Sequence, residues 1–194
     1  MREVIKMVVV LTLLCALSGG LLAAVKKGTE ARIIEQRLQH VKGPVLALIL
    51  KGAENNPIKS RFSLKNKDFF IGVFDHKPSV AAFEIFGKGF GGSLGVMVAV
   101  NVETDKIVGV GVTTHSETPG LGARAKTDPE FVSQFTGMSL LDPFAVKQDG
   151  GRVDSITGAT ISSRGVCGAM NSASALYKKL KPEITAKMRQ TPVS

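Results

Sequence analysis

The sequence predicts an α+β protein, in which a single N-terminal transmembrane helix is followed by a domain of antiparallel strands with helices packed on them. Three patterns predict this fold. Residues 7–25 form an apolar run without a charge, residues 69–114 contain four runs rich in β-branched and aromatic side chains, and apolar residues recur at helical spacing between Val166 and Leu180. The length of 194 residues is close to that of one domain.

The apolar run reads MVVVLTLLCALSGGLLAAV and is long enough for a membrane anchor. At about 1.5 Å per residue it extends about 28 Å, close to the ~30 Å hydrocarbon core of a bilayer. The apolar part of a cleaved signal peptide is usually shorter, about 7–15 residues. Leu22-Ala23-Ala24 is a poor cleavage site, although Ala16-Leu17-Ser18 could serve as one. A retained anchor is therefore favoured over a cleaved signal peptide. Its orientation stays open, because basic residues flank both ends of the run: Arg2, Lys6, Lys26, Lys27, Arg32 and Arg37.

The chain is expected to divide into five parts. These are an N-terminal tail (1–6), the anchor (7–25), a juxtamembrane helix and linker (26–60), the main domain (61–181) and a C-terminal tail (182–194). Charged residues and good helix formers fill residues 26–42, and Gly43-Pro44 is expected to break that helix. A short apolar run at 45–50 and a turn at 53–59 complete the linker.

The main domain is predicted to contain strands at 69–74, 80–86, 94–102 and 107–114. Thr104-Asp105 should join the last two as a hairpin, and Thr127 to Glu130 looks like a helix start, with a capping side chain followed by proline. Asp149-Gly150-Gly151 predicts a hairpin turn before an extended segment at 152–156. A final helix is expected to run to about Leu180.

Composition excludes several functions. The formal net charge is +9, with 25 basic against 16 acidic residues, but the basic residues are dispersed and the chain has no Trp and one Tyr. We therefore expect no nucleic-acid binding. Cys15 and Cys167 make no disulfide framework, and three scattered histidines show no ligand spacing, so no metal site is expected.

Residues 154–163 read DSITGATISS and place many hydroxyl groups before the final helix. Gly158 and Ala159 are small, so a bulky group can approach the backbone. Ser162 or Ser163 could cap the helix, and a helix N-terminus with nearby hydroxyls favours phosphate. The residues alone fit either a plain capped turn or a phosphate site.

This stretch resembles a known signature. Asp154-x-x-Thr157-Gly158-Ala159-Thr160 is similar to the D-x-x-[S/T]-G-A-[S/T] pattern of FMN-binding domains that are flavinylated on the last Thr or Ser. The resemblance implies that Thr160 carries FMN through a phosphoester made by a flavin transferase. It also implies that Thr157, Gly158 and Ala159 line the phosphate and that Asp154 belongs to the transferase recognition pattern. Apart from the resemblance, the hydroxyl of Ser162 could be a further donor to the phosphate.

A second stretch, HSETPGLG at residues 115–122, resembles a segment of the G subunit family of Rnf complexes and of the related C subunit of the sodium-pumping NADH:quinone reductase. The resemblance implies that this loop lies against the flavin. The implied cofactor-binding residues are Glu117, Thr118, Gly120, Leu121 and Gly122, with His115 as a group that tunes the flavin or is an ordinary loop histidine. Arg164 could pair with the phosphate or be solvated. The GKGFGG run at 87–92 resembles a third family segment, and it also fits a tight connection between strands.

The resemblance implies a membrane-anchored flavoprotein with covalent FMN that transfers electrons within an ion-translocating ferredoxin:NAD oxidoreductase (Rnf) complex, without a complete active site or catalytic residue of its own. Implied partners are other membrane subunits of that complex, the flavin transferase and membrane lipid. The implied location is the bacterial cytoplasmic membrane, single-pass, with the domain on the outer face. Three alternatives stay open: the quinone-reductase C subunit, a non-redox membrane-anchored binding domain, and a soluble enzyme with dissociable FMN.

Overall fold

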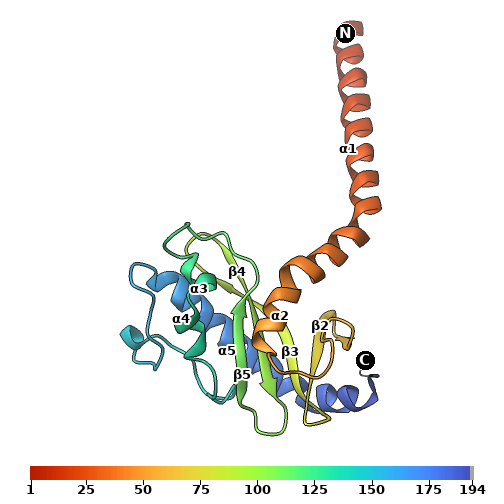
Figure 1. Ribbon diagram of the computed structural model, residues 1–194. Coiled ribbons are helices and arrows are strands. Elements are labelled where there is room, and N and C mark those ends of the chain that lie inside the picture. The colour runs from red at the N-terminus through yellow and green to blue at the C-terminus, as the bar shows by residue number, and fades with distance from the viewer. Residues whose placement is uncertain (193–194) are drawn as a thin grey trace. The chain divides into compact units, whose positions relative to one another are not determined.

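The computed structural model describes residues 1–192 and separates the chain into two compact units, Met1–Gln39 and His40–Ser194 (Figure 1). The first unit contains helix α1 (Arg2–Arg37), in which no residue is buried. The helical stretch beginning at Arg2 is long and apolar enough to cross a membrane, with a mean hydropathy of 2.5 in its most apolar window. Residues expected to form the N-terminal tail are therefore already helical.

The break expected at Gly43-Pro44 does not occur, because helical structure continues through it. A π-helical turn spans Leu38–Lys42, and helix α2 (Gly43–Ile49) follows directly. Pro44 lies in the first turn of α2, where a missing N–H removes no intrahelical hydrogen bond. The apolar run at 45–50 is thus mainly helical.

The second unit is built on a five-stranded antiparallel meander in the order β1-β2-β3-β4-β5 (Figure 1). The strands are β1 (Arg61–Leu64), β2 (Lys67–Phe74), β3 (Lys77–Lys88), β4 (Ser93–Asn101) and β5 (Ile107–Val112). The four predicted strands are confirmed, and β1 was missed. Lys65 and Asn66 form its turn to β2 with φ values of 49° and 61°, the left-handed conformation that a two-residue hairpin requires.

The long helix α5 (Thr160–Gln190) covers one face of this sheet, and its buried side chains form the core with alternate residues of β2 to β5. It continues well past Leu180, the end expected from sequence, because Ile184 and Met188 are also buried. Helix α2 packs on β5 at Gly109 and Gly111, where an added Cβ would lie 2.9 Å from Ile49 Cβ and 2.6 Å from Val45 Cγ1.

The segment between β5 and α5 holds short helices. The predicted helix start is confirmed: Asp128 caps α4 (Pro129–Ser133) by accepting a hydrogen bond from the Glu130 amide at 3.1 Å, after the single turn α3 (Arg124–Thr127). The hairpin predicted at residues 149–151 is wrong. A 3₁₀ turn, η2 (Lys147–Asp149), and Gly150 at φ +80° form a closed loop instead, after which Val153 runs in the same direction as Val146 and pairs with it in a parallel bridge.

Candidate functional site

The hydroxyl-rich turn leads into the N-terminus of α5. Gly158 adopts φ +79°, a left-handed conformation that glycine takes without strain. The amide of Ala159 donates to the carbonyl of Ile156 at 2.9 Å, and the helix begins at Thr160 without a side-chain cap on Ala159. The amides of the first turn therefore lack intrahelical partners, and the positive end of the helix dipole lies at Thr160.

The two serines after Thr160 do not cap α5, because the helix starts before them. Ser163 Oγ accepts from the amide of Ile156 and donates to the carbonyl of Ala159, both at 3.0 Å, so it ties the turn to the helix from inside. The hydroxyl of Ser162 is buried and donates to the carboxylate of Glu117. Both hydroxyls are thus occupied by the protein itself.

The loop between β5 and α3 lies beside this turn. It is closed by hydrogen bonds from the amides of Leu121 and Ala123 to the carbonyl of Thr118, both at 3.2 Å, and Gly120 takes φ +75°. Its Glu117 side chain is only 5% exposed, while Leu121 is 49% exposed. The loop therefore presents an apolar side chain outward and a carboxylate inward.

The connection between β3 and β4 supplies a third segment. The amide of Gly89 donates to the carbonyl of Gly92 at 2.8 Å, which closes the loop tightly. The amide of Gly91 donates to Glu117 Oε1 at 2.9 Å. Phe90, at the tip, is 71% exposed. The glycine-rich run is thus a tight strand connection that also presents an aromatic ring.

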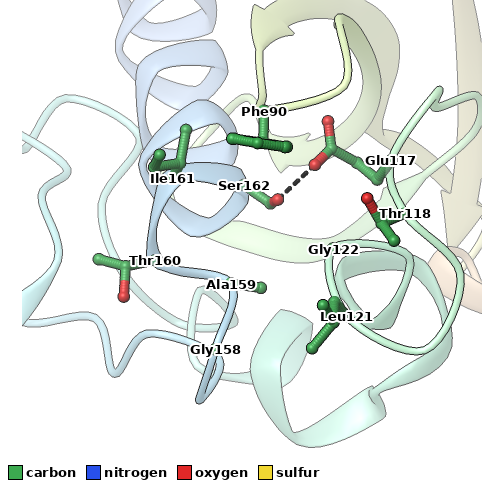
Figure 2. A pocket seen from close by; sticks show the side chains of 10 residues that line it. All are labelled: Phe90, Glu117, Thr118, Leu121, Gly122, Gly158, Ala159, Thr160, Ile161 and Ser162. Atoms are coloured by element: carbon green, nitrogen blue, oxygen red, sulfur yellow. Dashed lines mark hydrogen bonds between the residues drawn. The ribbon is translucent and has the colours of Figure 1, made fainter.

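These three segments enclose a cavity of about 390 Å³ (Figure 2). Figure 2 shows side chains from all three around it, with Phe90 from the glycine-rich loop, Leu121 from the loop after β5 and Ile161 from α5. The rim is largely apolar, and the polar residues of the lining are Thr118, Thr160 and the buried pair of Glu117 and Ser162. The lining residues are Phe90, Glu117, Thr118, Leu121, Gly122, Gly158, Ala159, Thr160, Ile161 and Ser162.

Most residues singled out from sequence lie in this lining, and a few do not. Phe90 and Ile161 were missed as site residues, although Phe90 lies in the glycine-rich run that the family resemblance indicated. Ile161 has a weaker signal, an apolar residue on the exposed side of a first helical turn. The predicted residues outside the lining are Gly120, His115, Thr157, Asp154 and Arg164.

Asp154 and Thr157 line a neighbouring polar hollow of about 150 Å³. Gln134 fixes the backbone there: its Oε1 accepts from the amide of Asp154 at 2.7 Å, and its Nε2 donates to the Asp154 carbonyl at 3.2 Å. The Asp154 carboxylate pairs with Lys147 at 2.8 Å. The motif is therefore held from both ends, by Gln134 before the turn and Ser163 after it.

Arg164 makes a two-pronged ion pair with Asp149, with both N–O distances 2.7 Å. The hydrogen bond from Arg164 lowers the pKa of Asp149, and the same bond raises the pKa of Arg164. The guanidinium thus has a protein partner in this structure, which neither sequence interpretation of Arg164 anticipated.

Two further residues lie outside the lining. His115 Nδ1 is buried and has no hydrogen-bond partner among residues 1–192. Cys167 is buried in the core, and burial raises the pKa of its thiol to about 11. Cys167 is a packing residue of α5, as its helical position favoured.

Comparisons with known proteins agree with this geometry. The FMN-binding domain family matches residues 89–175, which include all three segments around the cavity. The G subunit of the ion-translocating oxidoreductase complex of Stutzerimonas stutzeri is 33% identical over 170 residues, covering 80% of this chain and 73% of its own. The corresponding G subunit of Pseudomonas aeruginosa is 32% identical over 193 residues, covering 89% of this chain and 87% of its own.

The fold also matches a crystal structure. The C subunit of the Na⁺-translocating NADH-quinone reductase from Parabacteroides distasonis superposes with a TM-score of 0.52 at 30% identity, covering 59% of this chain and 62% of that chain. The similarity to the G subunits extends over more of both chains. With the cavity, the motif at Thr160 and these relatives together, the chain belongs to the family of G subunits of ion-translocating oxidoreductase complexes.

Proposed function

We propose that this chain carries FMN and transfers electrons as one component of a membrane-bound ion-translocating oxidoreductase complex, with the flavin phosphate joined to Thr160 Oγ by a phosphoester. One observation carries the proposal: the D-x-x-T-G-A-T motif ends on the first residue of α5, and that residue lines the cavity. The FMN-binding domain match and the G-subunit relatives support the same interpretation.

The residues around the cavity fit FMN. Its volume of about 390 Å³ lies within the roughly 300–1,000 Å³ typical of small-molecule sites. Phe90, Leu121 and Ile161 offer apolar surface to a planar ring system, and each is about half exposed or more. The free amides at the start of α5 suit a phosphate group, and an ester at Thr160 would leave that phosphate beside them.

FMN, when bound, supplies the redox chemistry, and the protein supplies position and surroundings. Thr160 holds the phosphate end covalently, which removes the dissociation equilibrium of the cofactor. Thr118 presents a hydroxyl to the cavity, and Gly122 keeps that wall free of a side chain. We expect no catalytic residue of the chain's own, because electron transfer needs no bond to be made or broken on a substrate.

The proposed location is the bacterial cytoplasmic membrane, with α1 as a single-pass anchor in contact with lipid. An exposed helix as apolar as residues 7–25 is stabilised by a hydrocarbon core. Placement of the second unit on the outer face rests on family resemblance, since basic residues flank both ends of the run. The proposed partners are other membrane subunits of the complex and, during maturation, a flavin transferase. Protease accessibility in oriented vesicles tests the orientation: protection of the second unit in right-side-out vesicles would contradict it.

The covalent assignment is tested by intact mass after co-expression of the full chain with its transferase. We expect a gain of about 440 Da, which is FMN less water, and a yellow colour that survives denaturation. Thr160→Val should lose both, Thr160→Ser should keep both, and Thr185→Val, a hydroxyl deletion elsewhere on α5, should also keep both. Covalent flavin in Thr160→Val would refute the assignment. Colour lost on acid precipitation would indicate dissociable FMN, and no flavin in the wild-type chain would favour a non-redox domain.

A further inference from the structure

Glu117 lies where the three segments around the cavity meet (Figure 2). We propose that Glu117 is the positioning residue that holds these segments in register for the flavin, and that its carboxylate is the reason for two glycines of the surrounding loops. The inference deepens the proposed function and rests on it for the flavin, but its packing part concerns the protein alone.

Both oxygens of Glu117 are bound by the protein. Oε1 accepts from the amide of Gly91 at 2.9 Å, and Oε2 accepts from the hydroxyl of Ser162. These partners are 26 and 45 residues away in the sequence. One buried side chain therefore connects the glycine-rich loop, the loop after β5 and the first turn of α5.

The neighbouring glycines fit around this carboxylate. A Cβ added to Gly89 would clash first with Glu117 Oε1, and it would also lie 2.8 Å from Leu94 Cδ1 and 2.9 Å from Glu117 Cδ. A Cβ added to Gly122 would lie 2.5 Å from Glu117 Oε2 and 2.6 Å from Ser162 Oγ. Neither glycine has a positive φ, so space rather than backbone conformation excludes a side chain here. Internal packing therefore explains the glycine at position 89 of the GKGFGG run, and no bound phosphate is needed to explain it.

Removing the carboxylate has two expected consequences. The hydroxyl of Ser162, which is buried, and the amide of Gly91, which is in an exposed residue, both lose their partner, and the buried hydroxyl left unsatisfied is costly. The three walls also lose their common attachment, so the ring and phosphate surfaces no longer keep one geometry. Glutamine offers a partial replacement of the same shape, because its oxygen can accept from Gly91 and its amide can donate to Ser162 Oγ. Glu117→Gln therefore separates the shape of this contact from its charge.

The packing part is tested without flavin, by a double-mutant cycle on the full chain in detergent. Tyr177 is the single tyrosine of a chain without tryptophan, and it is buried in the second unit, so its fluorescence reports unfolding of that unit. Gly89→Ala should lower Tm by about 3–10 °C, as overpacking does. In the Glu117→Ala background the same change should lower Tm by less than about half as much. An equal loss in both backgrounds would overturn the packing part.

The control for that cycle is Asn171→Ala. Asn171 makes two hydrogen bonds of 2.8 Å with the backbone of Phe144, and it lies outside the cavity lining. Its effect on Tm should add to that of Gly89→Ala, because the two positions share no partner. Coupling of the same size here would mean that the cycle reports general destabilisation, which would overturn the assignment to Glu117.

The positioning part is tested by flavin incorporation during co-expression with the transferase, measured as the fraction of chain with added mass. Glu117→Ala should lower this fraction severalfold, Glu117→Gln should restore most of it, and Asn171→Ala should leave it unchanged despite a lower Tm. Full incorporation in Glu117→Ala would refute the positioning role and leave Thr160 untouched. A wild-type chain without flavin would instead refute the proposed function, and the flavin-free cycle would still decide whether Glu117 accounts for Gly89.

Discussion

Helices α1 and α5 are of similar length, 36 and 31 residues, but they differ in burial: no side chain of α1 is buried, whereas many side chains of α5 are. No residue of α1 is buried, although apolar side chains occur on all its sides in the stretch 7–25. In α5 most residues from Ser162 to Met170 are buried, and from Met170 onward the buried apolar residues recur at three- and four-residue intervals and pack on the sheet. An apolar stripe is covered by a protein core, whereas an all-round apolar surface needs a nonpolar solvent.

The difference also shows in how charge is placed. Along α5, charged side chains occupy the positions between buried ones, and Lys181 reaches back to Asp105 at 2.5 Å. The run 7–25 of α1 contains no charge. The stability of α5 is therefore expected to depend on which side chain stands at each buried position. The stability of α1 in a membrane is expected to depend on how apolar the run 7–25 is as a whole.

The largest expected effect comes from placing the same charge in each helix. Ala173→Asp in α5 buries an unpaired carboxylate at a fully buried position, and it should cost more than about 4 kcal/mol and unfold the second unit. Ala16→Asp, in the middle of the apolar run, should leave that unit folded. It should make the free energy of inserting the helix into the membrane less favourable by about 2.5–3.5 kcal/mol. Tyr177 fluorescence measures the first effect, and retention in carbonate-washed membranes measures the second.

A control for this pair is Gly168→Ala, on the exposed side of α5, where an added Cβ has no neighbour within 4 Å. Alanine favours helix over glycine, so stability should rise by up to about 1 kcal/mol. If Ala173→Asp unfolded at the wild-type temperature, or if Gly168→Ala destabilised the unit strongly, the buried and exposed faces of α5 would have been assigned wrongly.

The next effect compares the two cysteines. Burial raises the pKa of Cys167 in α5 to about 11, whereas Cys15 is exposed on α1. At pH 8 the thiolate fraction of Cys167 should be about 100-fold below that of a thiol with the ordinary pKa of 9.0. In mild detergent, a small maleimide should therefore modify Cys167 only after denaturation, whereas the rate at Cys15, which lies outside the second unit, should not depend on whether that unit is folded; peptide mass spectrometry can measure both. Modification of Cys167 in the folded unit as fast as after denaturation would contradict the packing of α5.

A smaller effect concerns the far end of α5. Burial alone would raise the pKa of Asp105, but hydrogen bonds from Lys181 and Tyr177 together hold it below 3.8. Because the folded pKa is lowered, the stabilisation is present above about pH 3.8 and is lost as the pH falls through the folded value. Asp105→Asn keeps the left-handed backbone, with φ 58° in the wild type.

The Asp105→Asn variant should have a Tm about 2–6 °C lower than the wild type at neutral pH. Its Tm should no longer show the decline that the wild type shows as the pH falls into the acid range. Thermal unfolding followed by Tyr177 fluorescence from pH 7 to pH 2 gives both values. A variant that retained the full acid-dependent decline would show that other carboxyl groups cause it.

The smallest effect is expected at Arg164. Its ion pair with Asp149 is solvent-exposed, with side-chain exposures of 49% and 39%, and such pairs contribute little. Arg164→Gln should therefore leave Tm unchanged within error. It should also leave flavin incorporation unchanged, because Arg164 does not line the cavity. A clear loss of incorporation at constant Tm would restore the interpretation that Arg164 pairs with the phosphate.

Sequence patterns predicted the elements whose signal is local. Four strands were recognisable from their β-branched and aromatic residues, and the Asp128-Pro129 helix start from its capping pattern. Strand β1 was not, because Arg61–Leu64 is short and only half buried, and its extended form depends on pairing with β2. The end of α5 was placed too early because the helix continues through Pro182, and Ile184 and Met188 beyond it are also buried.

The candidate site divides in the same way. The composition of the run DSITGATISS indicated a helix start and left a plain capped turn and a phosphate site both open, and resemblance indicated Thr160 within it. The capping role predicted for Ser162 or Ser163 was wrong, because the helix begins at Thr160, before both serines. Phe90 was overlooked because nothing local shows which way an aromatic side chain in a glycine loop points.

By itself, the sequence determined the apolar length of the anchor, four of the five strands, the amphipathic final helix and the threonine motif, because each depends on neighbouring residues and their period. Only the tertiary structure decided that Glu117 meets Gly91 and Ser162, and that Gly89 and Gly122 leave room for its carboxylate. The physical reason is distance along the chain. Contacts between residues 26 and 45 positions apart exist only once the sheet and α5 have brought their loops together.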